Sequence, residues 1–193
     1  CSGSNSTLRN VVIRGNAAVP YGAGGATYFW ETTQTLEDVQ IIGNSSCQGG
    51  GAYSRGGTST YTRVTFTAND AQNRAGACTT AAVDGGGLYA VGAVTVQASL
   101  FTGNTASSGG GMSTYDPVTV TDTVFDGNTA SYLGGGMDDG GCSALTDVTF
   151  RNNSGPSYGG GGLSLQCNGA SNTYRRLTVT GNSAPLSGAN MAL

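Results

Sequence analysis

Apolar and polar positions follow one repeated pattern along this chain. Three apolar residues spaced Φ-x-x-Φ-x-Φ precede two variable positions and an asparagine, as with Leu8, Val11 and Ile13 before Asn16. The last two apolar positions are two residues apart, which is the period of a β-strand, and helical spacing is absent. Successive asparagines of the pattern lie 24 to 35 residues apart. A repeat of this length is typical of solenoids, so the pattern predicts a stack of similar β-coils.

Runs of glycine follow the asparagines and lead into a second short alternating segment. Gly85–Gly87 precede Leu88, for example, and Gly134–Gly136 precede Met137. Each repeat therefore predicts strand, turn, strand and turn, with glycine where the backbone needs a positive φ or where a side chain would collide with the next coil. The predicted fold class is all-β, a right-handed parallel β-helix of about seven to eight coils.

Equivalent residues of successive coils should stack into ladders inside such a helix. We expect a buried stack of apolar and aromatic side chains, and a ladder of amides that bond to one another and to the backbone. The predicted ladder residues are Asn16, Asn44, Asn69, Asn104, Asn128, Asn153 and Asn182, with Phe66, Phe101, Phe125 and Phe150. A ligand-binding row is the alternative for the asparagines.

The paired motifs F-x-x-N and G-G-[AGILM] resemble the repeats of the chlamydial polymorphic outer membrane proteins and related β-helical surface proteins. The first motif is literal at Phe66/Asn69, Phe101/Asn104, Phe125/Asn128 and Phe150/Asn153, and the other copies carry Ile or Val in place of Phe. The resemblance spans essentially the whole chain. It implies a β-helical surface protein in an extracellular setting, with a part in adhesion.

Composition and charge argue against two classes of partner, nucleic acids and the membrane interior. The net charge is −3, and no basic cluster is larger than the pair Arg175 and Arg176, which argues against nucleic acid. No stretch approaches the roughly 20 apolar residues that cross a bilayer, so we expect no membrane insertion by this segment. The sequence starts at Cys1 in the middle of a repeat, and we expect residues 1–193 to be a single β-helix segment of a longer protein.

Five cysteines in a surface-type solenoid indicate an oxidising compartment, so the expected location is extracellular or at the cell surface. Cys47 and Cys78 lie in the loops between asparagine and glycines of successive coils. Cys142 and Cys167 occupy nearly the same place in another adjacent pair of coils. We predict these two disulfides, with Cys1 unpaired or bonded to another chain. Five reduced thiols are the alternative.

Catalytic chemistry has little support in the sequence. Histidine and lysine are absent and no nucleophile motif occurs, so we expect no enzymatic activity and no cofactor. A polysaccharide lyase or hydrolase is the alternative function, because many parallel β-helices have that activity. Asp122 and Asp147 hold the same position in consecutive coils and form a candidate metal site, with plain charge compensation as the other interpretation. Asp126 and Arg151 should compensate each other in the same way.

An ice-binding solenoid is the second alternative, because regular outward threonines on a flat β-solenoid can bind ice. The two rows that flank the aromatic position are interrupted by charged and aliphatic residues, such as Asp126 and Leu100.

Three sequons offer candidate N-glycosylation sites at Asn5, Asn152 and Asn44, of which Asn44 should be the least accessible. The aromatic cluster Tyr21, Tyr28, Phe29 and Trp30 either fills the core or forms a contact surface.

The sequence therefore predicts a non-catalytic extracellular protein with a structural or adhesive role, a component of a cell surface or fibre. Its partners should be glycans, or other copies or modules of the same assembly. The variable insertions, above all residues 70–84, are the expected recognition surface.

Overall fold

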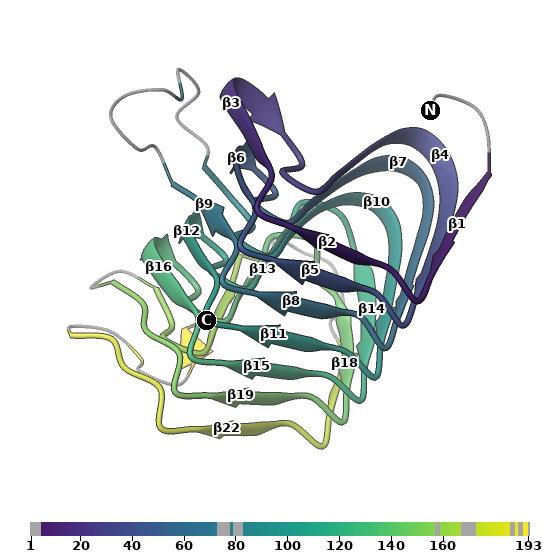
Figure 1. The fold of residues 1–193 in the computed structure, drawn as a ribbon. Coiled ribbons are helices and arrows are strands. Elements are labelled where there is room, and N and C mark those ends of the chain that lie inside the picture. Colours follow the sequence, from purple (N-terminus) through teal and green to yellow (C-terminus); the bar gives the residue numbers. More distant parts are fainter. Residues whose placement is uncertain are drawn as a thin grey trace.

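The chain is a parallel β-helix in which every described element is a β-strand (Figure 1). The computed structural model describes residues 5–72, 78, 83–156, 159–166, 173–185, 188 and 191–192. All strand pairs among the described residues are parallel, and equivalent residues of successive repeats stand directly in register, for example Phe101 beside Phe66 and Phe125. The predicted fold class is confirmed.

Three sheets form the sides of the coil. Sheet A contains β1 (Ser6–Arg9), β4 (Thr27–Glu37), β7 (Ala52–Thr62), β10 (Leu88–Gln97), β13 (Met112–Thr114), β14 (Val118–Thr121), β17 (Met137–Asp139), β18 (Ala144–Thr146), β20 (Leu163–Leu165), β21 (Thr173–Arg175) and β23 (Met191–Ala192). Sheet B contains β2 (Val12–Arg14), β5 (Gln40–Ile42), β8 (Thr65–Thr67), β11 (Leu100–Thr102), β15 (Val124–Asp126), β19 (Thr149–Arg151) and β22 (Thr178–Thr180). Sheet C contains β3 (Ala17–Ala23), β6 (Ser45–Gln48), β9 (Asp70–Ala71), β12 (Thr105–Ser108) and β16 (Thr129–Leu133).

The described strands mark fewer coils than the sequence predicts. The seven strands of sheet B, from β2 to β22, enclose about six turns of the helix rather than seven to eight. The prediction counted each copy of the asparagine motif as a coil, whereas a turn is the interval between two copies.

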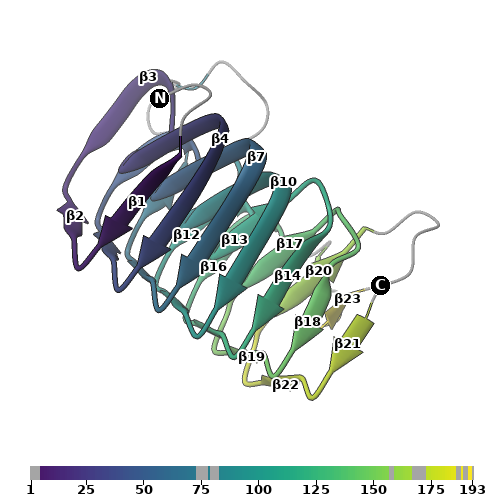
Figure 2. The ribbon, with the colours of Figure 1, turned by 90° about the vertical axis from the view of Figure 1, so that its right-hand side faces the viewer.

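Sheet A bends in the middle, which gives it two arms (Figure 1). The first arm is residues 27–30, 52–55 and 88–91 of the long strands together with β13, β17, β20 and β23. The second arm is β1, β14, β18, β21 and residues 33–37, 58–62 and 93–97, which face the viewer in Figure 2. Glu31, Gly56, Gly57 and Gly92 lie at the bend, and all have positive φ. In later coils a loop replaces the bend, so one long strand becomes two short ones.

Left-handed backbone conformations also turn the chain between sheets. The residue before each ladder asparagine has φ between 52° and 66°, and it is glycine in five coils, Ala68 and Asn152 in the others. The corner between sheets A and B is similar, with φ of 49° to 56° from Asn10 to Arg176. Glycine is common at the first corner because an added Cβ strains this conformation in other residues.

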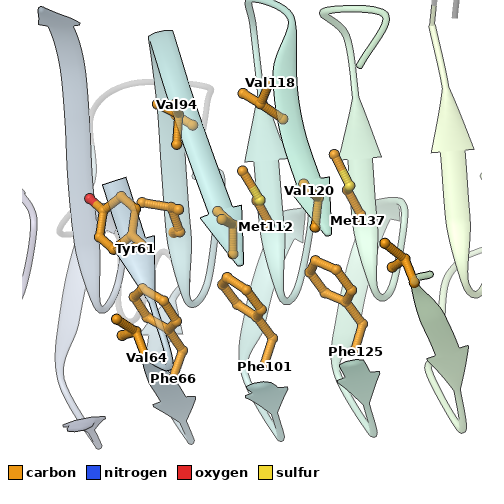
Figure 3. Close-up of a cluster of buried hydrophobic side chains, with 14 of the residues drawn as sticks. Tyr61, Val64, Phe66, Val94, Phe101, Met112, Val118, Val120, Phe125 and Met137 are labelled. Carbon is orange, nitrogen blue, oxygen red and sulfur yellow. The ribbon is translucent and has the colours of Figure 1, made fainter. Parts of the chain in front are cut away.

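The core is a column of stacked side chains along the helix axis (Figure 3). Phe66, Phe101, Phe125 and Phe150 are fully buried, with ring centroids 4.5, 4.7 and 4.8 Å apart in nearly parallel planes. Apolar side chains from sheet A, including Met112 and Met137, are also fully buried in this core. The predicted phenylalanine stack is confirmed.

The disulfide between Cys47 and Cys78 is present, as predicted, and it links successive coils across a sequence separation of 31. Cys142 carries a free thiol and is partly buried, so the predicted bond to Cys167 is not formed in the structure. Cys142 has a φ of 63° in the turn after β17, beyond the residues in strand register with β20. The prediction located Cys142 by counting residues from the glycine run, but the turn after β17 decides where its side chain lies. Cys167 and Cys1 lie outside the described residues.

Candidate functional site

The seven asparagines form a structural ladder. In each step from Asn16 to Asn182, the Oδ1 atom accepts hydrogen bonds from the backbone N–H and from Nδ2 of the preceding asparagine, at 2.9 to 3.1 Å. From Asn44 onwards, Nδ2 also donates to the carbonyl of the apolar residue in the preceding coil. Because these amides are committed to the fold, they are not available to a ligand.

The charged rows at the corners are ion pairs between coils. Arg176 donates to both carboxylate oxygens of Asp147 at 2.5 and 2.6 Å. Of the two interpretations of Asp122 and Asp147, these contacts support charge compensation rather than a metal site. Arg151 pairs with Asp126 at 2.9 Å, as predicted. The Arg63 guanidinium lowers the pKa of Asp38 through a hydrogen bond. Within the described part of the chain, no three Asp, Glu, Cys or His residues lie together as metal ligands would.

The sequons differ in access. Asn5 and Asn152 are exposed. Asn44 is completely buried, and its Nδ2 atom donates to Ile13 and Asn69. Nδ2 is the atom that would carry a glycan, so the prediction of Asn44 as a glycosylation site is wrong for the folded chain.

A hollow of about 400 Å³ opens on the outer face of the first arm of sheet A. Tyr89, Ser113 and Asp138 stand next to each other in strand register on β10, β13 and β17. Each follows a core residue, Leu88, Met112 or Met137, so its side chain points outward. Asp84, Thr114, Tyr115, Gly140 and Gln166 complete the lining. Asp84 is the last residue of the predicted recognition insertion, of which 73–77 and 79–82 lie outside the described residues.

The two carboxyl groups of this hollow share an unusual environment. Burial raises the pKa of Asp138 to about 7, the hydrogen bond from Ser164 opposes the shift, and the charges of Asp84 and Asp139 add to it. Burial also raises the pKa of Asp84, against a hydrogen bond from Ser108. The Nε2 atom of Gln166 is 3.5 Å from Oδ1 of Asp138. No arginine lines the hollow among the described residues.

Asp139 holds the wall of the hollow in place from the inside. Its carboxylate is fully buried and accepts hydrogen bonds from Thr114, Gly141, Ser143 and Tyr174 at 2.8 to 3.2 Å. These donors come from β13, from the turn after β17 and from β21. The neighbouring Asp138 is therefore presented outward from a rigid strand.

Aromatic side chains continue the site along the helix axis. Tyr28, Tyr53 and Tyr89 stack on the outer face of the first arm, with ring centroids 5.1 and 5.4 Å apart. The Arg55 guanidinium lies 4.7 Å from the ring centroid of Trp30. A second hollow of about 300 Å³ is lined by Arg55, Tyr89, Val91 and Tyr115. Tyr89 and Tyr115 thus line both hollows, and Tyr115 is 73% exposed.

The predicted aromatic cluster is divided between core and surface. Phe29 packs partly buried against the core, whereas Tyr28 is exposed on the outer stack. The side chain of Tyr21 lies outside the described part of the structure. Neither of the two alternatives, core filling or contact surface, describes the whole cluster.

Threonines form a regular outward row on the second arm of sheet A. The residues in strand register are Thr7, Thr35, Thr60, Thr95, Thr119, Ala144 and Thr173. On sheet B the rows that flank the aromatic position are interrupted, as expected from the sequence. The row on the second arm was not predicted from the sequence, because the prediction covered only the two rows beside the aromatic position. The signal was available, since each member directly precedes the first apolar residue of a repeat.

The hollow itself was also missed by sequence reasoning. Tyr89, Ser113 and Asp138 each lie two residues after the last glycine of a run, and Tyr115 and Gln166 each lie four residues after it, but the residue type at these positions differs between repeats. The residues at these outward positions change type from one repeat to the next, so no recurring motif marks the site. Their common feature is only that the coil stacks them on one face.

No helix among the described residues is long and apolar enough to cross a membrane. Comparison with known proteins finds no matching family model, no matching curated protein and no matching solved structure.

Proposed function

We propose that this chain is a non-catalytic, extracellular β-helix that binds glycans on the first arm of sheet A and serves adhesion. The observation that carries the proposal is Tyr115, an aromatic side chain that is 73% exposed between two hollows. A large aromatic ring on the surface marks a contact site when polar groups converge beside it. Here Asp84, Asp138 and Gln166 supply those groups.

The chemistry of the hollows fits sugars. The C–H face of a pyranose packs on an aromatic ring, and its hydroxyls bond to carboxylate and amide groups. Tyr115 and Tyr89 offer the rings, and the two hollows together follow the helix axis, which suits a linear chain. The resemblance to β-helical surface proteins and the Cys47–Cys78 disulfide support an extracellular location.

The test compares two exposed tyrosines. Tyr115→Ala should weaken binding of cellohexaose or the N-acetylglucosamine hexamer at least about tenfold, the scale of one lost stacking contact in a hollow. Tyr132→Ala removes a side chain that is 57% exposed on sheet C, away from both hollows, and should leave binding unchanged. Calorimetry with the purified chain measures both. No binding to any oligosaccharide, or equal losses in both variants, would contradict the proposal.

The non-catalytic part of the proposal needs its own assay. A pair of carboxyl groups in one hollow, of which at least one has a raised pKa, is also a feature of glycoside hydrolases, which use one as the acid and the other, ionised, as the base or nucleophile. We expect no new reducing ends when the chain is incubated with the sugars that it binds. Release of reducing ends that disappears in Asp138→Asn would instead establish the polysaccharide hydrolase.

Ice binding remains the second candidate, because six of the seven positions in the row on the second arm are threonine. Adjacent strands repeat this row of methyl and hydroxyl groups about every 4.8 Å. Thr95→Lys should abolish any inhibition of ice recrystallisation, whereas Thr102→Lys on sheet B should not. The absence of inhibition by the unaltered chain would exclude this candidate.

A further inference from the structure

The carboxyl groups of the hollow differ from those of the charged rows between coils. Glu37, Asp38, Asp126 and Asp147 each form an ion pair with an arginine. Asp84 and Asp138 line a hollow that has space for a ligand and no basic side chain in its described lining. Their partners within the protein are neutral groups of Ser108, Ser164 and Gln166. The hollow therefore holds two carboxyl groups whose negative charge, when they are ionised, is not compensated by a basic side chain of the described lining.

The position of this charge is fixed before any ligand arrives. Asp138 is 8% exposed on a short strand, and the hydrogen bonds of Asp139 tie that strand to β13, to the following turn and to β21. A rigid site loses little entropy on binding, so its contacts contribute fully to affinity. A cation held there would gain charge-assisted hydrogen bonds in a partly desolvated place.

We propose that the hollow selects glycans with free amino groups, whose ammonium group binds between the carboxylates of Asp84 and Asp138 while an adjoining ring packs on Tyr115. This inference rests on the proposed glycan-binding function and names its ligand class. The exposed face of Tyr115 and the phenol of Tyr89 favour a sugar over a plain polyamine, because both rings border the same hollow. An acidic glycan such as a polyuronate meets like charge and is disfavoured.

Binding of an ammonium group should release a proton from the hollow. Asp138 lies beside Ser113 on β13 and Ser164 on β20. The side chain of Gln166 and the charge of Asp84 also act on its carboxyl group. Burial raises its pKa to about 7, so we expect the free protein to hold a proton there at pH 6, and a bound cation favours the ionised form. Proton uptake or release is therefore a readout that packing alone does not produce.

The experiment compares three hexamers by calorimetry at pH 6, in two buffers of different ionisation enthalpy. The glucosamine hexamer should bind at least about tenfold more tightly than the N-acetylglucosamine hexamer or cellohexaose, and with proton release. Asp84→Asn and Asp138→Asn should remove the preference, and Asp138→Asn should also remove the proton release. Asp122→Asn, the same change at an exposed corner, should alter neither.

Each other outcome decides against the inference in a distinct way. Equal affinity for all three hexamers overturns it and leaves glycan binding in place, whereas the absence of any binding overturns both. Tighter binding of hexalysine than of the glucosamine hexamer assigns the hollow to a peptide and overturns it as well. If an Asn variant fails to fold, the salt dependence of the unaltered chain decides. The preference for the amine must then become smaller as the salt concentration rises from about 50 to about 500 mM, because salt screens the attraction between the ammonium group and the carboxylates. A preference that does not depend on salt contradicts the inference.

Discussion

Glycine has two separate functions in this fold at the scale of single residues. At the corner before the ladder asparagine, Gly103 has a φ of 63°, and an added Cβ would meet no atom within 4 Å. In the glycine runs, a Cβ on Gly111 would lie 2.5 Å from the carbonyl oxygen of Gly136 in the next coil. The first position needs a backbone conformation and the second needs space.

Two alanine substitutions separate these functions. Gly103→Ala should lower the free energy of unfolding by about 1 kcal/mol, since Ala68 already occupies the equivalent corner with a φ of 52°. Gly111→Ala should lower it by about 3 kcal/mol or more, because the coils must move apart around the added methyl group. The substitution is the same, so effects on the unfolded chain cancel. Equal changes in urea denaturation would contradict this distinction.

The asparagine ladder is the device that joins neighbouring elements. Each buried asparagine satisfies backbone and side-chain groups of two adjacent coils at the corner between sheets B and C. These bonds are out of reach of water, so an interrupted ladder leaves buried polar groups without partners.

The position along the ladder should decide the effect of losing an amide. Asn128→Ala leaves the backbone N–H and Nδ2 of Asn104 without their acceptor, and we expect a loss of about 3 kcal/mol or more. Asn16 is exposed and only donates within the ladder, so Asn16→Ala should cost about 1 kcal/mol or less. Chemical denaturation of the two variants is the measurement, and similar losses would show that the ladder contributes little beyond exposed bonds.

The whole molecule is a linear stack in which each coil contacts mainly its neighbours. In such proteins, stability is close to a sum of coil and interface contributions. The Cys47–Cys78 disulfide joins two successive coils near one end of the described stack. Its contribution should therefore be large but local.

Removing this disulfide tests the linear view. The double variant Cys47→Ser, Cys78→Ser should lose about 3 to 4 kcal/mol, the loop-entropy value for the 31-residue separation. Hydrogen exchange should increase in β6, β7 and β10, and remain unchanged in β19 and β22. Cys142→Ser replaces a free thiol and is the control. Increased exchange along the entire rod would indicate that the chain unfolds as one cooperative unit.

The sequence by itself determined the cross-section of this protein. The period of the apolar positions, the repeated asparagine and the glycine runs are local constraints that every coil must satisfy, so they recur and can be recognised. They predicted the parallel β-helix, the Phe66 to Phe150 stack, the ladder and the Cys47–Cys78 bond.

Only the tertiary structure decided which variable residues meet. Asp84, Tyr115, Asp138 and Gln166 come from four different segments, and strand register together with the bend of sheet A brings them to one hollow. The predicted Cys142–Cys167 bond depended in the same way on a turn rather than on a repeated position, and Cys142 carries a free thiol in a turn with a φ of 63°. Inward residues recur because every coil must stack, whereas the candidate site depends on which residue types occupy the outward positions, and these types do not recur from coil to coil.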